Sequence, residues 1–516
     1  MGESLWPDFE SDKLMVTKKP QEEKRESQQT VFISAYRSVS VRYILYSDIF
    51  KRLREKKGLR IVVFLKANDI EYYRKKLGGD NILFESVLFD KAYSLLRHNI
   101  LSVFFVLVRR CLSGRRKGYD NTTDKVLQYR YKEDLSGSLK WRMFFQAVRM
   151  VAAIGSRTSF IRKTILASET FLFPGRMYDG YFKKYRPDML VTSSIGNMID
   201  SYFMRAAKRS RCKVVSVVHS WDNTSTRNYR GADPDVVIAW NDIMKREVNI
   251  FHDVPEEKIW VGGIAHWDFY FDDSFRPRSK KEFLRFCGLS EGKQIIFYGT
   301  SSPKAFRNTF DVVEQLLCEM EKDPFLSGAQ LLVRLHPSYL NRQKGNEGLV
   351  LDRYKERMDG LKRIHGDRIA FNLPEVVVLN DDLDMTLEDM YILAEILKYS
   401  DVMLTEYSTL MIEGSIFDLP VINIGLYNFI DTAKPASYFE EMTHIKRIIE
   451  TGATKNAYTI EQVCEYIKWY LEDPCRDREL RKKVVDREVD TNPGHAGEQI
   501  AEYIYELLHE RMKVNS

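Results

Sequence analysis

The sequence predicts an α/β protein built on two doubly wound parallel sheets, one in each half of the chain. The chain has 516 residues, which is enough for two large hydrophobic cores. Short apolar runs typical of buried strands recur along it, and segments with helical periodicity separate them. Polar residues gather directly after several of these runs, at the edge where open parallel sheets bind their ligands.

The composition is that of a globular protein, with 44% hydrophobic and 29% charged residues. The formal net charge of +6 is a mild excess that suits anionic small molecules, and we expect no nucleic-acid partner. The six cysteines form no CxxC pair, so we expect reduced thiols rather than disulfides or a zinc site. The N-terminal segment lacks an apolar signal core, and no apolar run is long enough to span a bilayer, so we expect a cytoplasmic protein.

The first half of the chain begins with a charged, aperiodic segment, residues 1–28, which we expect to be a disordered tail. A domain over residues 29–265 follows. It opens with a strand at Thr30–Ser34, a helix over 42–57 and a strand at Leu59–Leu65, a spacing that implies a parallel sheet. Beyond a mostly helical stretch from about 85 to 180 we expect strands at 188–192, 213–218, 235–240 and 258–261, and a helix over 196–209.

The segment 95–118 joins an apolar stretch to a basic cluster. One interpretation is peripheral contact with an anionic membrane surface, on the inner face of the cell membrane. The other is a buried helix with a solvated basic end. The cluster consists of Arg109, Arg110, Arg115, Arg116 and Lys117.

The second half of the chain repeats this organisation. We expect a polar linker over residues 266–281, a domain over 282–490 and a C-terminal helix within 491–516. The strands expected in the second domain are 294–299, 330–335, 369–373, 402–405 and 421–424.

A polar cluster follows the strand at 213–218 and contains Trp221, Asp222, Asn223 and Arg227. The Asp222 carboxylate could take a proton from an acceptor hydroxyl. Alternatively, the cluster is a polar loop whose side chains bond to their own backbone.

Two clusters in the second half could hold phosphates. Arg334 and His336 lie at the end of one strand and can donate hydrogen bonds to phosphate oxygens, although a His-Pro pair can also be purely structural. Ser408 and Thr409 would begin a helix, where hydroxyls and free backbone amides bind anions. Glu413, one turn further on, could accept bonds from ribose hydroxyls. A plain helix cap explains the same pattern.

Thr300 and Ser301 follow the strand at 294–299 and give a weaker signal, since they could hold a phosphate or simply turn the chain. The sequence has no Walker-type loop, no GxGxxG after a strand, no HExxH and no GxSxG, which counts against kinases, dehydrogenases, zinc proteases and α/β-hydrolases. We interpret the acidic run 381–384 as a polar loop and expect neither a metal nor a cofactor.

Taken in order, these motifs resemble the CDP-glycerol glycerophosphotransferase-like branch of the GT-B glycosyltransferase superfamily, and they are similar to those of bacterial capsule transferases. The strongest match is Leu393–Gly425, with Arg334–Pro337 and the hinge-like Val261–Asp268 in support. The resemblance implies a GT-B architecture, in which a Rossmann-like acceptor domain and a Rossmann-like donor domain face a cleft.

The resemblance also implies roles for these side chains. Trp221, Asn223, Arg227 and Asp268 would line the acceptor side of the cleft. The family carries a His where this chain has Asp222, which favours sugar transfer with a carboxylate base. The donor would be held by Arg334, His336, Ser408, Thr409, Glu413, Thr300 and Ser301.

The sequence therefore predicts a metal-independent, inverting glycosyltransferase of surface polysaccharide synthesis. It would move a sugar from a nucleotide-activated donor to a glycan or lipid-linked acceptor. Three alternatives remain open: a CDP-glycerol-type polyol-phosphate transferase, a non-hydrolysing nucleotide-sugar 2-epimerase, and a non-catalytic protein that binds nucleotide sugars or glycans.

Overall fold

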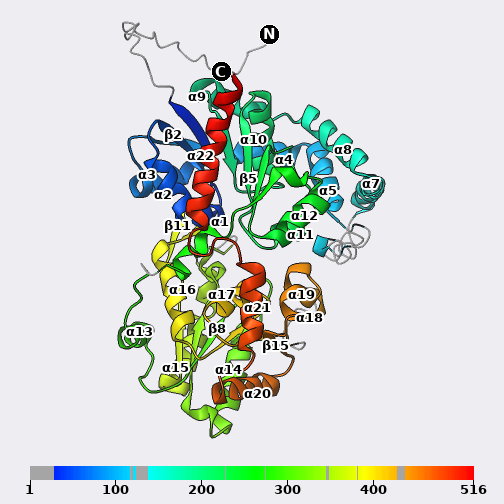
Figure 1. Cartoon of the computed structure of the whole chain (residues 1–516). Helices are drawn as coiled ribbons and strands as arrows, with labels where there is room; N and C mark the ends of the chain where they lie inside the picture. The colour runs from blue at the N-terminus through cyan, green and yellow to red at the C-terminus, as the bar shows by residue number, and fades with distance from the viewer. Residues whose placement is uncertain are drawn as a thin grey trace, which may run out of the picture.

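The computed structural model describes residues 28–515 except 115, 117, 118, 120, 124–137, 227, 273, 274, 344–347, 380, 381 and 427–435. The chain forms two lobes, one above the other in Figure 1. The predicted tail lies outside the described residues apart from residue 28, and Arg227 lies outside them as well.

The first lobe is built on a seven-stranded parallel sheet with the order β3-β2-β1-β4-β5-β6-β7. The order reverses between β1 and β4, so the predicted doubly wound sheet is confirmed. Helices cover both faces, and Ile61, Val62 and Val63 of β2 are accordingly fully buried. The strands are β1 (Gln29–Ser34), β2 (Leu59–Leu65), β3 (Ile82–Ser86), β4 (Met189–Thr192), β5 (Lys213–Val217), β6 (Val236–Ala239) and β7 (Ile259–Val261).

The helix expected over 42–57 is interrupted. Val41–Leu45 is a π-helix, and α2 begins only after Ser47, whose hydroxyl accepts a bond from the Ile49 backbone N–H at 3.3 Å. The described helices of this lobe are α1 (Ser38–Ser40), η1 (Val41–Leu45), α2 (Asp48–Glu55), α3 (Ile70–Leu77), α4 (Phe89–His98), α5 (Ile100–Leu112), α7 (Leu139–Gly155), α8 (Ser159–Leu172), α9 (Asp179–Tyr185), α10 (Met198–Arg209), α11 (Asn223–Thr226) and α12 (Asp242–His252), with 3-10 turns at 67–69, 176–178, 256–258 and 265–270.

The second lobe holds a six-stranded parallel sheet in the order β10-β9-β8-β13-β14-β15, so its predicted doubly wound sheet is also confirmed. Its strands are β8 (Ile295–Gly299), β9 (Gln330–Arg334), β10 (Ile369–Asn372), β13 (Val402–Thr405), β14 (Val421–Ile424) and β15 (Thr454–Ala457). The described helices in the second half of the chain are α13 (Lys280–Cys287), α14 (Thr309–Lys322), α15 (Lys355–His365), α16 (Leu387–Tyr399), α17 (Leu410–Ile416), α18 (Ala436–Glu440), α19 (Thr443–Ile449), α20 (Ile460–Glu472), α21 (Arg478–Glu488) and α22 (Ala496–Asn515), with 3-10 turns at 326–328, 337–340, 350–353 and 366–368.

The acidic run 381–384 was wrongly expected to be a polar loop. Much of it belongs to an antiparallel hairpin of β11 (Val376–Leu379) and β12 (Asp382–Met385). Asp384 is buried and accepts a hydrogen bond from the Tyr46 hydroxyl of the first lobe at 2.5 Å. The hairpin therefore belongs to the contact between the lobes.

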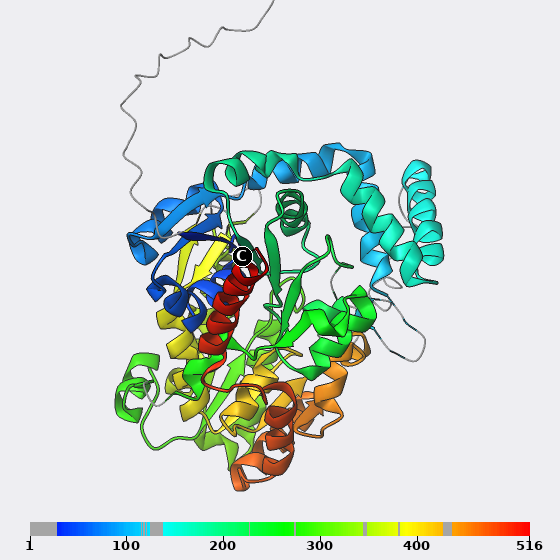
Figure 2. The same cartoon turned by 45° about the horizontal axis from the view of Figure 1, so that its top comes forward.

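The last helix, α22, returns to the first lobe and lies beside α2 (Figure 1, Figure 2). Trp260 stacks on Tyr503 with ring centroids 4.3 Å apart. Asp268 was expected on the acceptor side of the cleft, but its carboxylate caps this helix. Its oxygens accept bonds from the backbone N–H groups of Ala496 at 3.0 Å and Gly497 at 2.6 Å.

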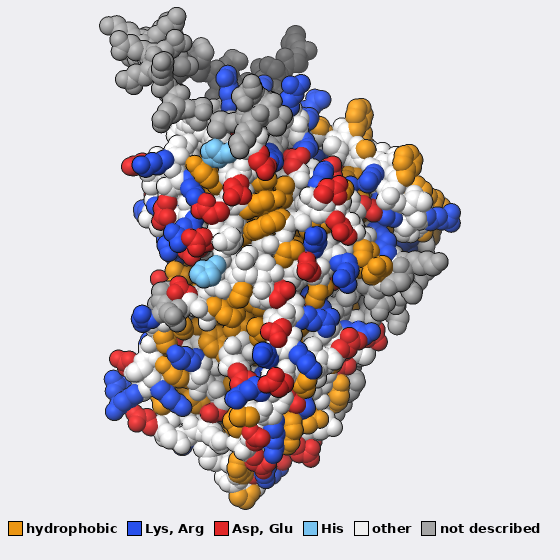
Figure 3. All heavy atoms as spheres, in the orientation of Figure 1, with side chains coloured by type: hydrophobic (Ala, Val, Ile, Leu, Met, Phe, Trp, Pro, Cys, Tyr) orange, Lys and Arg blue, Asp and Glu red, His pale blue; other side chains and the backbone are white. Residues whose placement is uncertain are grey.

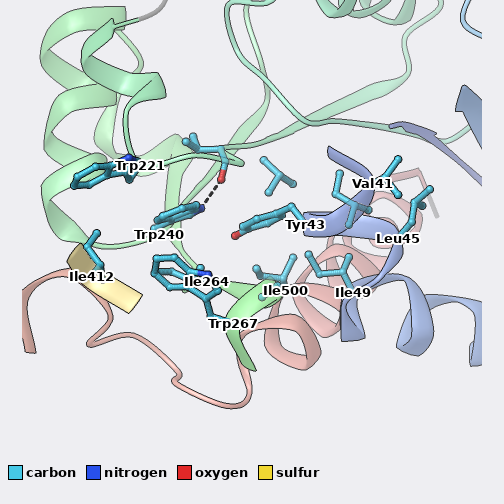
Figure 4. Close-up of a cluster of buried hydrophobic side chains, with 14 of the residues drawn as sticks. Val41, Tyr43, Leu45, Ile49, Trp221, Trp240, Ile264, Trp267, Ile412 and Ile500 are labelled. Atoms are coloured by element: carbon cyan, nitrogen blue, oxygen red, sulfur yellow. Dashed lines mark hydrogen bonds between the residues drawn. The ribbon is translucent and has the colours of Figure 1, made fainter. Parts of the chain in front are cut away.

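An aromatic cluster joins the lobes (Figure 4). Tyr43 and Trp240 stack with ring planes 4° apart, and the Trp240 indole N–H donates to the Val218 carbonyl at 2.6 Å. Ile412 of α17 and Ile500 of α22 approach the same cluster from the other lobe and from the returning helix. The two sheets therefore share a continuous hydrophobic core, which favours a fixed relation between the lobes.

Two residues of the basic cluster in the segment 95–118 are not solvated as one interpretation expected, whereas Arg115 and Lys117 lie outside the described residues. Arg109 is fully buried, and its Nε lies 2.7 Å from Glu169. Arg116 is partly buried and donates to the Phe251 carbonyl at 3.2 Å. Within the described residues, no helix is both long enough and apolar enough to cross a membrane.

Replacing Asp268 with alanine is expected to lower the free energy of unfolding by about 1 kcal/mol at pH 5, because α22 loses its cap. Burial raises the pKa of Asp268 to about 7. The wild type therefore loses stability from this group as the pH rises from about 4 through 7, and the difference between the two proteins should shrink by pH 8. Denaturant unfolding at pH 5 and pH 8 measures the difference in unfolding free energy between the two proteins, and the exposed Asp80→Ala is the control. Equal stability of wild type and Asp268→Ala at pH 5 would contradict the capping role.

Candidate functional site

The loops that follow the strands of the two sheets meet between the lobes. In the first lobe, Arg42 follows β1. In the second lobe, His336 follows β9 and Ser408 follows β13. Since ligands of open parallel sheets bind beyond the carboxyl ends of the strands, this interface is the candidate site.

Arg42 brings to this interface a half-buried positive charge that has no ion-pair partner. Its guanidinium has no hydrogen bond or ion pair with the described residues, and its Nε is buried without a partner. Burial lowers the pKa of the guanidinium, while the nearby carboxylates of Glu413, Asp389 and Asp384 act in the opposite direction. A cation removed from water without a hydrogen-bonded partner is costly, so an anionic ligand would stabilise it.

His336 offers a hydrogen-bond donor close to Arg42. Its Nδ1 accepts a bond from the Ser338 backbone N–H at 3.1 Å, so we assign the proton of the neutral ring to Nε2. The ring reaches solvent but is crowded by protein. This desolvation and the charge of Arg42 lower the pKa of His336 to about 4. At neutral pH the side chain is therefore an uncharged Nε2–H donor, which suits a phosphate oxygen.

Arg334 is held by its own lobe. It donates to Asp389 Oδ1 at 2.7 Å and to the side-chain oxygen of Asn372. Arg334 and Asp389 are both buried, and Asp389 Oδ1 also accepts from the Glu375 backbone N–H at 2.8 Å. Arg334 therefore contributes positive potential from a fixed position, with part of its donor capacity already used.

Ser408 lies directly before α17. Its hydroxyl is 2.8 Å from the Thr405 hydroxyl and accepts from the Leu410 backbone N–H at 3.3 Å. The preceding Tyr407 has a φ of 47°, a left-handed conformation that is strained for a residue with a side chain. The chain therefore turns sharply here and presents Ser408 at the end of β13.

Glu413 connects the second lobe to the turn between the lobes. It is buried and accepts a bond from the Tyr270 hydroxyl at 2.5 Å. Burial raises its pKa, whereas bonds from Tyr270 and Thr409 and the charge of Arg42 act in the opposite direction. Its carboxylate is thus already shared among protein groups, and ribose binding stays a prediction.

Thr300 and Ser301 shape the loop next to His336. The Thr300 hydroxyl accepts from the His336 backbone N–H at 3.0 Å. The Ser301 backbone N–H donates to Glu406 at 2.6 Å, and the Ser301 hydroxyl donates to the Glu406 carbonyl at 3.0 Å. The Thr300 bond fixes the backbone of His336, and the Ser301 bonds fix the neighbouring loop to Glu406.

Trp221, which was predicted to line the acceptor side, packs between the lobes. It is only 4% exposed, and its ring meets that of His444 edge-on with centroids 4.7 Å apart. Arg447 lies beside it and pairs with Glu488 at 2.9 Å and with Glu247 at 3.2 Å. Trp221 is thus enclosed by both lobes, and its place on the acceptor side stays a prediction.

Asp222 sits at the start of α11, half-exposed. Its carboxylate accepts from the Ser220 hydroxyl at 2.5 Å and from the Thr226 hydroxyl at 3.0 Å. Asn223 is buried, with Nδ2 3.4 Å from His219 Nε2. These local bonds match the polar-loop interpretation, and they also orient the Asp222 carboxylate.

Sequence reasoning missed Arg42 and His266. Arg42 lies in a segment whose basic residues look like a solvated helix face, and only the structure shows it between the lobes. His266 packs against Tyr43 and Trp240, and its Nδ1 is buried without a partner among the described residues. Burial, followed by the charges of Arg42 and His219, lowers the pKa of His266 well below its usual value.

These groups make the interface suited to an anion. Arg42 supplies a charge, His336 supplies a directed donor, and Arg334 adds fixed positive potential. Within the described residues, His, Cys, Asp and Glu side chains form no group of three or more that could hold a metal ion.

The family model of CDP-glycerol:poly(glycerophosphate) glycerophosphotransferase matches residues 205–506, more than half of the chain. The chain belongs to this family. The resemblance seen in the sequence is therefore confirmed, and the protein is a transferase. A nucleotide-activated donor of the CDP-glycerol type is what the family implies. Membership of this family supports the polyol-phosphate alternative better than the sugar transfer that the sequence favoured.

A solved structure supports the fold of this glycerophosphotransferase family member. A candidate UDP-N-acetylglucosamine 2-epimerase from Listeria monocytogenes is similar with a TM-score of 0.51 and 11% identity, over 94% of this chain and 97% of that chain. At this identity the likeness shows the shared GT-B-like fold alone. The wall teichoic acid polymerase TagF is similar with a TM-score of 0.46 and 12% identity, over 94% of this chain and 90% of that chain. No curated protein matches the chain.

Replacing Arg42 with methionine should raise the melting temperature of the ligand-free protein, because a half-buried charge that has no hydrogen bond or ion pair is removed at similar side-chain volume. The same change should weaken CDP binding by about 10- to 100-fold, since a charge-assisted bond to phosphate is lost. Thermal unfolding with and without CDP measures both effects. Lys51→Met, at an exposed site on α2, is the control. A lower melting temperature together with an unchanged CDP response would show that Arg42 is structural.

Proposed function

We propose that the protein transfers a polyol-phosphate unit from a CDP-linked donor to a hydroxyl of a cell-envelope polymer or lipid-linked acceptor. The family match supports the donor class, and the unpaired charge of Arg42 beside His336 is the observation that carries the site. The reaction would take place at the inner face of the cell membrane.

The donor's diphosphate would lie between the lobes. Arg42 and the Nε2–H of His336 would bind its oxygens, with Arg334 adding potential from behind. The Ser408 and Thr409 hydroxyls would approach the same phosphates, and Glu413 would hold the ribose. Charge that develops on the leaving phosphate would be stabilised most, because these donors are already oriented.

The Asp222 carboxylate would accept the proton of the attacking hydroxyl. The new bond joins that oxygen to the phosphorus next to the polyol, and the bond from this phosphorus to the bridging oxygen breaks. Cytidine monophosphate leaves. The bonds from Ser220 and Thr226 would keep the carboxylate oriented for this step.

Sugar transfer is the second candidate, because Asp222 stands where the family carries a His. The leaving nucleotide separates the two reactions. Attack on phosphorus releases a nucleoside monophosphate, whereas attack on the anomeric carbon of a nucleoside-diphosphate sugar releases a nucleoside diphosphate.

Incubation with an acceptor and either CDP-glycerol or nucleoside-diphosphate sugars, followed by chromatography of the nucleotides, tests the proposal. We expect cytidine monophosphate from CDP-glycerol, formed only with acceptor. Release of a nucleoside diphosphate from a sugar donor would establish sugar transfer. An isomerised sugar nucleotide formed without acceptor would establish an epimerase, and binding without turnover of any donor would establish a non-catalytic protein.

His336→Ala should lower turnover of CDP-glycerol by about 100-fold, as expected for the loss of one oriented donor to the transition state. Ser408→Ala should act in the same direction. His98→Ala and Ser94→Ala, both at exposed sites of the first lobe, are matched controls, measured in the same steady-state assay. Near-normal activity of His336→Ala would remove this side chain from the phosphate site.

A further inference from the structure

A small cavity lies where the hairpin of β11 and β12 meets the first lobe. Its first-lobe walls come from the ends of β1 and β2 and from α3, and its second-lobe wall comes from β12. The helix α1 contacts β12 at this place, and Figure 1 shows the hairpin there between the lobes. The cavity has a volume of about 10 Å³, which is room for about one water-sized group.

Arg37 lines this cavity and is a second cation without a partner between the lobes. Its guanidinium is half-buried and has no hydrogen bond or ion pair with the described residues. The hydroxyl of Ser38, which also lines the cavity, likewise has no hydrogen bond with them. Arg37 lies five residues before Arg42 in the segment after β1, so one segment carries two cations that are open to ligands.

Asp384 places an acceptor in the same cavity. It is 1% exposed, and the Tyr46 hydroxyl donates to its Oδ2 at 2.5 Å. Its other oxygen, Oδ1, is buried without a hydrogen-bond partner among the described residues. Burial raises the pKa of this carboxyl, and the nearby hydroxyls of Tyr46 and Tyr73 act in the opposite direction. A buried carboxylate oxygen without a donor is costly, so a hydroxyl that donates to it would stabilise the protein.

The outer surface gives no comparable selection on the face of the molecule shown in Figure 3. Basic and acidic side chains are interspersed there over both lobes. Neighbouring charges of opposite sign cancel much of each other's potential, so this face attracts neither cations nor anions strongly. Selection of a polar ligand therefore rests on the polar groups between the lobes that lack partners.

We propose that the cavity and Arg37 together form a subsite for a polyol phosphate. A hydroxyl of the polyol would enter the cavity and donate to Asp384 Oδ1, and the phosphate would stay outside the cavity against the Arg37 guanidinium. The size of the cavity fits this arrangement, since it admits a hydroxyl and excludes a phosphate. The choice of a polyol phosphate rests on the proposed function, and the group belongs either to the donor or to the end of the acceptor.

Calorimetric titration of the full chain with glycerol phosphate and with propyl phosphate tests the role of the hydroxyl. The two probes carry the same phosphate, but propyl phosphate has no hydroxyl on its carbon chain. We expect glycerol phosphate to bind at least about tenfold more tightly, because the analogue leaves a buried acceptor unpaired. Equal affinities for the two probes would overturn the inference.

Asp384→Asn should remove most of this preference, since a neutral amide is a weaker acceptor than a carboxylate. Asp384 also joins the lobes, so Tyr46→Phe is the matched control. It removes the bond between the lobes and leaves Oδ1 in place. Tyr46→Phe should keep the preference for glycerol phosphate. Loss of the preference in both variants would make Asp384 a lobe contact alone and would overturn its role as a ligand acceptor.

Arg37→Met should weaken glycerol phosphate binding by about tenfold or more, and it should leave the affinity for CDP unchanged. Arg285→Met, at an exposed site on α13, makes the same change in net charge and should bind both ligands as the wild type does. Unchanged melting temperatures would show that the variants fold. Wild-type affinity of Arg37→Met for glycerol phosphate would overturn the inference.

Competition with nucleotides identifies the source of the polyol phosphate. Saturating CDP should leave glycerol phosphate binding intact, because the diphosphate is expected at Arg42 and His336. If CDP-glycerol blocks glycerol phosphate and CDP does not, the subsite takes the polyol phosphate of the donor. If neither nucleotide blocks it, the subsite takes that of the acceptor.

Loss of glycerol phosphate binding with CDP alone would place the probe at the diphosphate site and would overturn the inference. None of these measurements uses turnover. A failed subsite and a failed transfer reaction therefore give different results, since the transfer is judged by release of cytidine monophosphate.

Discussion

A positive charge without a partner, placed between the two lobes, is the constraint on which the functional site depends. The neighbouring charged groups already have protein partners. Arg334 is paired with Asp389, and Glu413 accepts a bond from Tyr270. Arg42 alone among these groups has no hydrogen bond or ion pair with the described residues. Such a charge lowers the stability of the ligand-free protein, and a bound anion would restore that stability. This trade-off is typical of binding sites.

This charge is useful only if the two lobes keep their relation, because Arg42 and His336 come from different sheets. Several contacts far apart in sequence maintain it. Asp268 caps α22, which lies against the first lobe, and Tyr46 bonds to Asp384 of the second-lobe hairpin. The stacked Tyr43 and Trp240 lie in the same shared core. The site is therefore a property of the whole chain, and neither lobe carries it alone.

Strands buried on both faces could be predicted because their apolar runs are continuous, as in Ile61–Phe64 of β2. The edge strand β3 and the polar β15 were missed, since Ile82–Ser86 is partly exposed and Thr454–Ala457 carries little apolar surface. His336 was identified as a candidate because it follows a strand. Arg42 was not identified, because only the folded chain brings it next to His336 of the second lobe. The burial of Trp221 and Asp268 was not foreseen, because a sequence does not show which side chains another element will cover.

The most direct test of the account is a crystal structure of the chain with CDP bound. We expect the diphosphate between the lobes, with the Arg42 guanidinium and the His336 Nε2 each within hydrogen-bond distance of a phosphate oxygen, about 3 Å. A diphosphate bound elsewhere, or one between the lobes that leaves Arg42 without a contact, would contradict the central claim that this unpaired charge exists to receive the donor.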